Sequence, residues 1–201
     1  FNLKIYLWLQ DLWPKVMDNK IQNKFLKKII YYICTYIYKN SDIILTQNDY
    51  YKEYLFEELN INKEKIHTFF NWSPVEPKFN YTKKNVKDLK LIFTGNIGES
   101  QNLDNLISVA KSLNINNVLI HIYGDGRYKN KLIKKIEFSN LKNIKVFPAL
   151  DIKLLQQKMY EYDAALLLLA PEYSHTIPAK FQFYISLAMP IIGAIDGEVN
   201  K

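Results

Sequence analysis

The feature that most constrains the fold is an apolar run that breaks at two glycines and continues into a helical pattern. The run covers residues 89–93, the glycines are Gly95 and Gly98, and apolar side chains then recur at helical spacing over residues 103–113. This order predicts a strand, a glycine turn and a helix. Such a unit points free helix N–H groups at an anion, and glycine lets backbone approach a phosphate. An ordinary strand–helix turn stays open as the alternative, because the dinucleotide fingerprint needs a third glycine.

The same alternation of strand and helix continues through the second half of the chain. Strands are predicted at residues 118–123, 144–147, 164–169 and 190–194, and helices at 127–136, at 152–160 and from Pro178. This alternation predicts an α/β protein with a doubly wound parallel sheet. Ligands bind beyond the carboxyl ends of such strands. We therefore expect the turns at 95–98, 124–126 and 196–198 to converge on one edge.

The first half predicts a smaller unit of the same kind. Strands are expected at residues 3–9, 42–45 and 65–70, and helices at 19–41 and from the N-cap Asn48 to residue 59. Residues 71–88 contain two prolines and several lysines without apolar periodicity, which favours a linker. We expect residues 1–86 and 87–201 to form separate units.

Composition narrows the class of protein. The chain has 201 residues, one cysteine and a net charge of +7. A single cysteine excludes a disulfide framework, and the apolar neighbours of Cys34 favour a buried thiol. The positive charge favours a polyanion or an anionic membrane surface as a partner. No stretch reaches the roughly 20 apolar residues of a membrane-spanning helix, and no signal peptide is recognised. We expect both ends to be cut from a longer chain.

The predicted helix at residues 19–41 combines basic and aromatic side chains. It contains Lys20, Lys24, Lys27, Lys28 and Lys39 without an acidic residue, and Phe25, Ile29, Tyr32, Ile33 and Tyr36 recur at helical spacing. Two interpretations stay open. The apolar stripe can pack on the core with the lysines in solvent, or the helix can rest on an anionic bilayer.

Four segments together resemble a known family. They are residues 11–14 with 70–72, the loop 93–101, the Gly124-Asp125-Gly126 turn, and residues 177–182 followed by 189–193. The chain resembles a retaining glycosyltransferase of the GT-B fold, family 4, of the type that transfers N-acetylated amino sugars in bacterial surface-polysaccharide synthesis, such as O-antigen or capsule. The resemblance implies two Rossmann-like domains, the second binding the nucleotide sugar. Residues 1–86 would be the rear part of the acceptor-side domain with the linker.

The sequence departs from the family pattern at two places. The family's paired glutamates would fall at His175 and Phe183, and the arginine and lysine common in the first loop would fall near Asn96 and Gln101. Lys180 is therefore the best remaining cation for a diphosphate and is our predicted catalytic residue. A lysine in the first turn of a helix is disfavoured by the helix dipole, which itself favours an anionic partner.

The resemblance implies the remaining site residues. Asp196 and Glu198 would contact sugar hydroxyls or cap a turn, and Gln10 and Asp11 would face the acceptor or close a strand; no residue stands out as a catalytic base. The full predicted donor site is Gly95, Asn96, Ile97, Gly98, Gly124, Asp125, Gly126, Pro178, Ala179, Lys180, Gln182, Asp196, Gly197 and Glu198.

The sequence contains no Asp-x-Asp pair and no His/Cys ligand cluster, which favours metal-independent transfer. We expect no cofactor besides a UDP-type sugar donor, a polyprenol-linked acceptor, and a cytoplasmic location with peripheral attachment to the inner face of the plasma membrane. The alternatives are a non-catalytic sugar-nucleotide-binding relative and a GT-B sugar-nucleotide epimerase. A nucleic-acid partner is not expected, because the lysines are dispersed and no binding motif is present.

Overall fold

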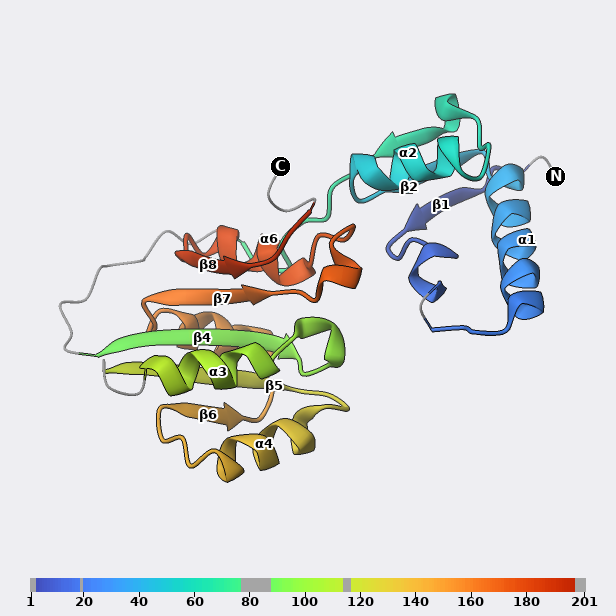
Figure 1. Cartoon of the computed structure of the whole chain (residues 1–201). Coiled ribbons are helices and arrows are strands. Elements are labelled where there is room, and N and C mark those ends of the chain that lie inside the picture. Colours follow the sequence, from blue (N-terminus) through green and yellow to red (C-terminus); the bar gives the residue numbers. More distant parts are fainter. Residues whose placement is uncertain (1–2, 19, 77–87, 114–116, 198–201) are drawn as a thin grey trace.

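The computed structural model describes residues 3–18, 20–76, 88–113 and 117–197. Their strands form two parallel sheets, one of three strands in the order β1-β2-β3 and one of five in the order β6-β5-β4-β7-β8. We call the first sheet with its helices the first lobe, and the second sheet with its helices the second lobe. Figure 1 shows β4 and β7 pointing toward the first lobe and β1 pointing toward the second. The carboxyl ends of the two sheets thus face one another.

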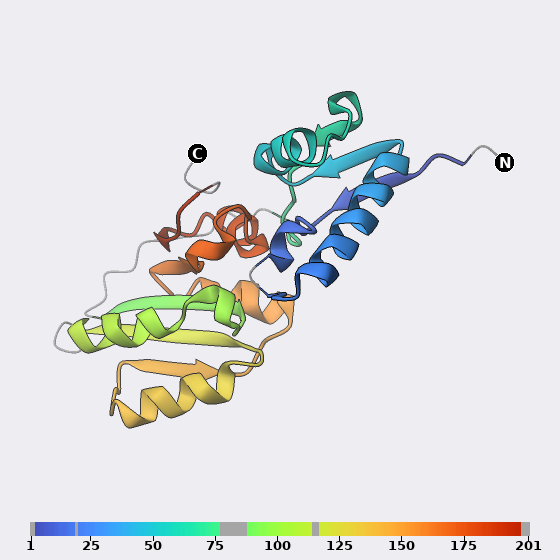
Figure 2. The same cartoon turned by 45° about the vertical axis from the view of Figure 1, so that its right-hand side comes forward.

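The first lobe is a short run of alternating strands and helices. Its strands are β1 (Tyr6–Leu9), β2 (Ile43–Thr46) and β3 (Ile66–Thr68), and its helices are α1 (Lys24–Asn40) and α2 (Asp49–Glu57), with short 3-10 turns at Lys15–Met17 and Lys63–Lys65. Leu9, Ile44 and Ile66 point to the side that α1 and α2 cover. Figure 2 shows α1 and α2 lying along the sheet from another side.

The second lobe has helices on both faces of its sheet. Its strands are β4 (Leu89–Asn96), β5 (Val118–Asp125), β6 (Ile144–Phe147), β7 (Ala164–Leu168) and β8 (Ile191–Ala194); its helices are α3 (Asp104–Leu113), α4 (Lys129–Phe138), α5 (Ile152–Met159) and α6 (Ala179–Ser186), with 3-10 turns at Glu99–Gln101 and Pro171–Tyr173. One apolar cluster joins the sheet to α3 and α4. A second cluster joins the opposite face to α5 and α6. The predicted doubly wound parallel sheet is confirmed.

Side-chain caps explain where several helices begin. The Asn23 side chain accepts from the N–H groups of Phe25 and Leu26, and Asn48 caps α2 through the N–H of Tyr51. Asp151 caps α5 in the same way. Each cap satisfies N–H groups that have no partner within their helix. The predicted cap at Asn48 is confirmed, and α1 begins at Lys24 instead of residue 19.

Helix α1 contradicts the core interpretation of its aromatic stripe. Phe25 and Tyr32 are each 73% exposed and Tyr36 is 60% exposed, whereas Cys34 and Tyr38 are buried. The buried residues lie on the opposite side of the helix from the predicted stripe. The physical reason is that residues sharing one helix face need a partner to be buried, and α1 has only one sheet face to pack on. The prediction that Cys34 is buried is confirmed.

Two further predictions concern the linker and the absence of a membrane-spanning helix. The expected boundary between residues 86 and 87 lies outside the described residues, and so does most of the predicted linker. None of the helices in the described ranges combines the length and the apolar character that crossing a bilayer requires.

Candidate functional site

The site lies where the strand order of the second sheet reverses. From β4 the chain passes to β5 on one side, whereas β7 pairs with β4 on the other side. The loops that leave neighbouring strands on opposite faces diverge, which opens a crevice at their carboxyl ends. Three adjoining cavities of about 600, 410 and 380 Å³ occupy this region between the lobes. Lys20 and Tyr173 line all three of them.

A buried tyrosine fixes Lys180 at the edge of this crevice. Lys180 itself lines none of the three cavities, but its partner Gln101 and its neighbour Ala179 line the 380 Å³ cavity. The hydroxyl of Tyr184 accepts from the N–H of Thr94 at 3.1 Å and lies 3.0 Å from the Thr94 hydroxyl, which ties α6 to β4. Lys180 lies one turn earlier on α6. Its Nζ is 3.8 Å from the centre of the Phe93 ring and donates to Oε1 of Gln101. A Cβ built on Gly95 would lie 3.9 Å from Nζ, so the ammonium is beside the glycine turn.

The surroundings of Lys180 favour binding of an anion beside its ammonium. Desolvation by the half-buried site lowers the pKa of its ammonium to about 7. The Phe93 ring and the Gln101 carbonyl favour the charged form, but neither replaces the water that burial removes. A negative charge bound beside the ammonium would restore the charged form. The environment is thus that of a cation without its counter-ion.

The glycines serve packing between the two turns more than approach to a ligand. Gly95 and Gly124 are paired across β4 and β5. A Cβ on Gly124 would lie 1.9 Å from the carbonyl oxygen of Gly95, so any side chain there would force the strands apart. Gly95 itself has a φ of +109°, which L side chains rarely adopt. The expected role of these glycines toward a phosphate therefore needs qualification: their first effect is to join β4 to β5.

The helix that follows the first glycine turn begins with its own acidic residue. After Gly98 a 3-10 turn intervenes and α3 starts only at Asp104, whose carboxylate accepts from the Tyr128 hydroxyl at 2.6 Å and pairs with Lys135. Asp104 thus supplies the negative charge that the dipole of α3 favours. The predicted order of strand, glycine turn and helix is confirmed, and the 3-10 turn separates the N-terminus of α3 from the glycines.

Helix α6 also offers its N-terminus to the crevice. Pro178 precedes α6, no side chain caps the helix, and its first turn holds no acidic residue. Pro178 and Ala179 line the 380 Å³ cavity. Backbone N–H groups at such an end attract anions, and Lys180 follows at the next position.

The structure brings part of the predicted site together. Asn96 and Gly98 line the 600 Å³ cavity. The predicted acceptor-side residues Gln10 and Asp11 line the 380 Å³ cavity together with Pro178 and Ala179. Ile97 has a fully buried side chain, so only its backbone can face a ligand; its N–H and C=O already bond Asp125 and Tyr128.

Other predicted residues lie outside the cavities of the described structure. Asp125 accepts from the N–H of Gly126 at 2.8 Å and pairs with Lys129 at 3.3 Å, and these contacts lower its pKa. None of the three cavities is lined by Gly95, Gly124, Gly126, Lys180, Gln182 or Asp196. Gly197 packs against the Ser174 carbonyl, and Glu198 lies outside the described residues.

Several residues in the crevice were not predicted as site residues. Gln47 and Asn71 from the first lobe line the 380 Å³ cavity, and Arg127 lines the 600 Å³ cavity. Arg127 follows the Gly124–Gly126 turn directly, so its position next to a predicted site turn was available in the sequence. Gln47 and Asn71 follow predicted strands, where the same edge rule applied.

His175 forms part of the contact between the lobes. Its carbonyl accepts from Nδ2 of Asn48 at 3.0 Å, and its ring centre lies 6.0 Å from that of Tyr50 and 6.2 Å from that of Tyr51. Nε2 of the buried ring has no hydrogen-bond partner among the described residues. Desolvation lowers the pKa of this imidazole, with Lys15 acting in the same direction.

Within the described ranges, no group of three or more His, Cys, Asp or Glu side chains is placed to hold a metal ion. The crevice presents instead a half-buried ammonium, an uncapped helix N-terminus and exposed backbone turns. Phe183, where the family pattern places a glutamate, lies on α6 and is buried in the apolar cluster between α6 and the sheet.

Comparison with protein families defines the class of this fold and site. Residues 74–193, more than half of the chain, match the family described as glycosyl transferases group 1. The chain belongs to this family. A comparison with curated protein sequences finds no match.

Solved structures share the fold at low sequence identity. HepE from Anabaena, in complex with UDP and glucose, has a TM-score of 0.74 and 12% identity over 98% of this chain and 54% of its own. TarM from S. aureus, in complex with fondaparinux, alpha-GlcNAc-glycerol and UDP, has a TM-score of 0.66 and 18% identity over 96% of this chain and 37% of its own. WaaG, a glycosyltransferase involved in lipopolysaccharide biosynthesis, has a TM-score of 0.68 and 12% identity over 98% of this chain and 59% of its own. The chain therefore spans roughly a third to three fifths of these proteins, which share its GT-B type of α/β fold.

Proposed function

We propose that the chain is part of a retaining, metal-independent glycosyltransferase of family 4 that moves an N-acetylated amino sugar from a nucleoside-diphosphate donor to a lipid-linked or glycan acceptor in bacterial polysaccharide synthesis. The observation that carries the proposal is the position of Lys180 beside the Gly95 turn, at the strand-order reversal and within the family match. The complexes of HepE and TarM with UDP support a uridine donor.

The crevice has what the bond exchange requires. The bond between the sugar C1 and the diphosphate oxygen breaks, a bond from C1 to the acceptor oxygen forms, and the acceptor proton passes to the leaving diphosphate or to water. Negative charge grows on the diphosphate, so fixed positive charge there lowers the barrier. Lys180 and the N-terminus of α6 supply that charge in this proposal, and Gln10 and Asp11 face the acceptor from the other lobe.

We further propose residues 87–201 as the C-terminal, nucleotide-sugar-binding domain and residues 1–86 as the rear part of the acceptor-side domain with the linker. Parallel sheets are normally covered on both faces. In the first lobe Tyr6, Trp8 and Phe69 are 61, 42 and 46% exposed on the uncovered face. An exposed face of this kind fits a domain that has further elements.

Transfer in the complete protein tests the function. UDP-N-acetylglucosamine and a polyprenyl-diphosphate-linked sugar should give a product whose C1 configuration, measured by NMR coupling, equals that of the donor. The reaction should persist in EDTA. An inverted product, or activity that EDTA removes and manganese restores, would contradict the mechanism. Donor binding without turnover would indicate a non-catalytic relative, and conversion of the free donor would indicate an epimerase.

Attachment to an anionic membrane is the second part of the proposal. The outer face of α1 exposes Phe25, Tyr32 and Ile33, and Lys24 and Lys28 on the same helix are exposed. Lys27 is instead held by the carbonyl of Asp18 at 2.5 Å. Exposed aromatic residues beside lysines suit the interface of a bilayer that holds a polyprenol-linked acceptor. The site would then work peripherally, on the cytoplasmic leaflet.

Sedimentation with liposomes containing phosphatidylglycerol measures this attachment. Binding should weaken as salt rises. Replacing Lys24 and Lys28 by glutamate should abolish it, whereas replacing Lys111 and Lys142 on the second lobe should not. Equal binding by both double variants would leave α1 without a membrane role.

A further inference from the structure

The donor crevice needs more positive charge than the second lobe's Lys180 provides. Asn96 and Gln101 stand where the family pattern places loop cations. A nucleoside-diphosphate sugar carries one negative charge on each of its phosphates, and an unpaired charge in a partly dry site is costly. We propose that Lys20, from the first lobe, is a second cation for the donor diphosphate and binds it across the gap between the lobes. This inference rests on the proposed function and deepens it.

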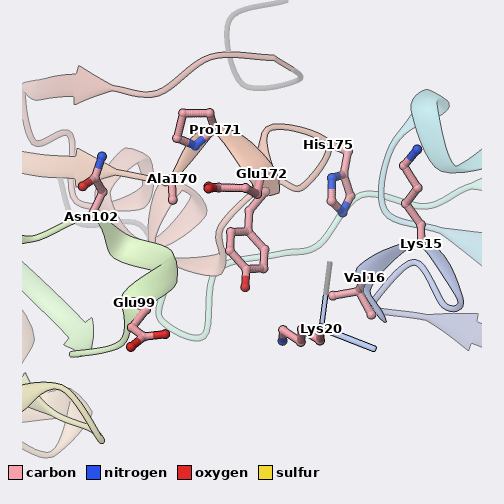
Figure 3. Close-up of a pocket in the computed structure, with 10 residues that line it drawn as sticks. Lys15, Val16, Lys20, Glu99, Asn102, Ala170, Pro171, Glu172 and His175 are labelled. Atoms are coloured by element: carbon pink, nitrogen blue, oxygen red, sulfur yellow. The ribbon is translucent and has the colours of Figure 1, made fainter. Parts of the chain in front are cut away.

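The position of Lys20 supports this role. Lys20 lines each of the three cavities of the crevice. Its Nζ lies 5.8 Å from the centre of the Tyr173 ring on the second lobe. Its backbone N–H donates to the Met17 carbonyl at 3.0 Å, which fixes the start of the side chain. Figure 3 shows the Lys20 nitrogen turned toward the side of the cavity where Glu99 lies.

The ammonium of Lys20 is available to a ligand. The ion pairs of the described residues are Lys129–Asp125, Lys135–Asp104 and Lys158–Glu161, and none of them includes Lys20. An exposed ammonium over a tyrosine ring loses little solvation when it meets an anion.

The 600 Å³ cavity combines the groups that a diphosphate requires. Lys20 and Arg127 face it from opposite lobes, and Gly98 and Ser100 bring the backbone of the loop after β4. Glu99 lines the same cavity and carries the opposite charge. The two cations outnumber this carboxylate, so the groups that line the cavity carry a net positive charge.

Because Lys20 comes from the first lobe, the bound diphosphate would contact both lobes. Gly98, Ser100 and Arg127 belong to the second lobe, whereas Lys20 belongs to the first. A diphosphate held by both sets of groups would oppose separation of the lobes.

Calorimetric titration of this chain with UDP-N-acetylglucosamine tests the inference. Lys20→Ala should weaken binding about tenfold, as for loss of a charged contact. The matched control is Lys24→Ala, which removes the same charge from an exposed residue of α1 that lines none of the three cavities; it should change binding less than about twofold. Uridine, which lacks the diphosphate, should bind Lys20→Ala and the unchanged chain equally.

The outcomes separate this inference from the proposed function. If the unchanged chain binds no UDP-N-acetylglucosamine, the proposed donor and this inference both fail. If the chain binds it and Lys180→Ala weakens binding, but Lys20→Ala behaves like Lys24→Ala, the inference fails alone. An equal loss of uridine affinity in Lys20→Ala would also overturn it, because a diphosphate contact cannot act on uridine. Circular dichroism should show the same helical content in all variants.

Discussion

The two lobes share one pattern of alternating strands and helices but differ in how their sheets are covered. In the second lobe, α3 and α4 pack on one face and α5 and α6 on the other. In the first lobe α1 and α2 cover a single face, and Trp8 and Phe69 remain exposed on the other. Helix α1 also exposes its own outer face, including Tyr32.

This difference shows that a local apolar pattern does not by itself determine whether a helix face is buried. An apolar stripe on a helix reports that its residues share a face, and the surrounding elements decide whether that face is buried. The second lobe supplies those elements from within the chain. The first lobe leaves two apolar surfaces uncovered within the described residues, and under our proposal further parts of its own domain and a membrane cover them.

The largest expected effect lies in the two-sided core of the second lobe. Ile120 on β5 is fully buried between the sheet and its helices. Ile120→Ala should lower the free energy of unfolding by about 2–5 kcal/mol, because it leaves a cavity in a packed core. Urea unfolding followed by circular dichroism measures the change. A loss below about 1 kcal/mol would show that this face is less tightly packed than the comparison requires.

The next largest effect is on donor binding and concerns Lys180 of the second lobe. Lys180→Ala should weaken binding of UDP-N-acetylglucosamine by about 1.5–3 kcal/mol, since a charged hydrogen-bonding group is lost. Lys153 is the matched control because it is also the second residue of its helix, α5, and is exposed. Calorimetry should show an unchanged affinity for Lys153→Ala. Equal effects of the two substitutions would remove Lys180 from the donor site.

The pH dependence of donor binding tests whether the Lys180 ammonium contacts the diphosphate. With a pKa lowered to about 7, Lys180 is increasingly neutral in the free protein as pH rises above that value. A bound diphosphate favours the charged form, so binding takes up a proton. The affinity should fall by up to about tenfold per pH unit above 7. Titrations from pH 6 to 9 measure the slope, and Lys180→Arg should flatten it because arginine stays charged. A flat profile for the unchanged chain would contradict this assignment.

The smallest effect belongs to the outer face of the first lobe. Ile33 is 50% exposed, whereas Tyr38 on the inner face is 3% exposed and donates its hydroxyl to the Trp13 carbonyl at 2.6 Å. Ile33→Ser should change the free energy of unfolding by no more than about 0.5 kcal/mol, and Tyr38→Ala should lower it clearly. Thermal or urea unfolding compares the two. A loss above about 1 kcal/mol for Ile33→Ser would show that the outer face is packed within this chain.

Local sequence information was sufficient for individual elements of both lobes. The apolar segment at residues 164–169 predicted a strand buried on both faces, and β7 is that strand. Asn48 predicted the start of α2, and Asn48 caps it. Caps, turns and strand periodicity act over a few residues, so neighbours in sequence determine them. The expectation that Lys180 lies near the Gly95 turn followed from the same edge rule, and the structure places it there.

The structure decided what depends on residues distant in sequence. The sequence alone put the N-terminus of α3 near the glycine turn, but the fold places Lys135 of α4 against Asp104 at that end. It left Lys20 as one of five lysines in a basic segment, and only the approach of the lobes brings Lys20 to Tyr173. The physical reason is that spacing along a chain specifies which side chains share a face. Burial, charge pairing and the contents of a crevice depend on which other element the fold places against that face.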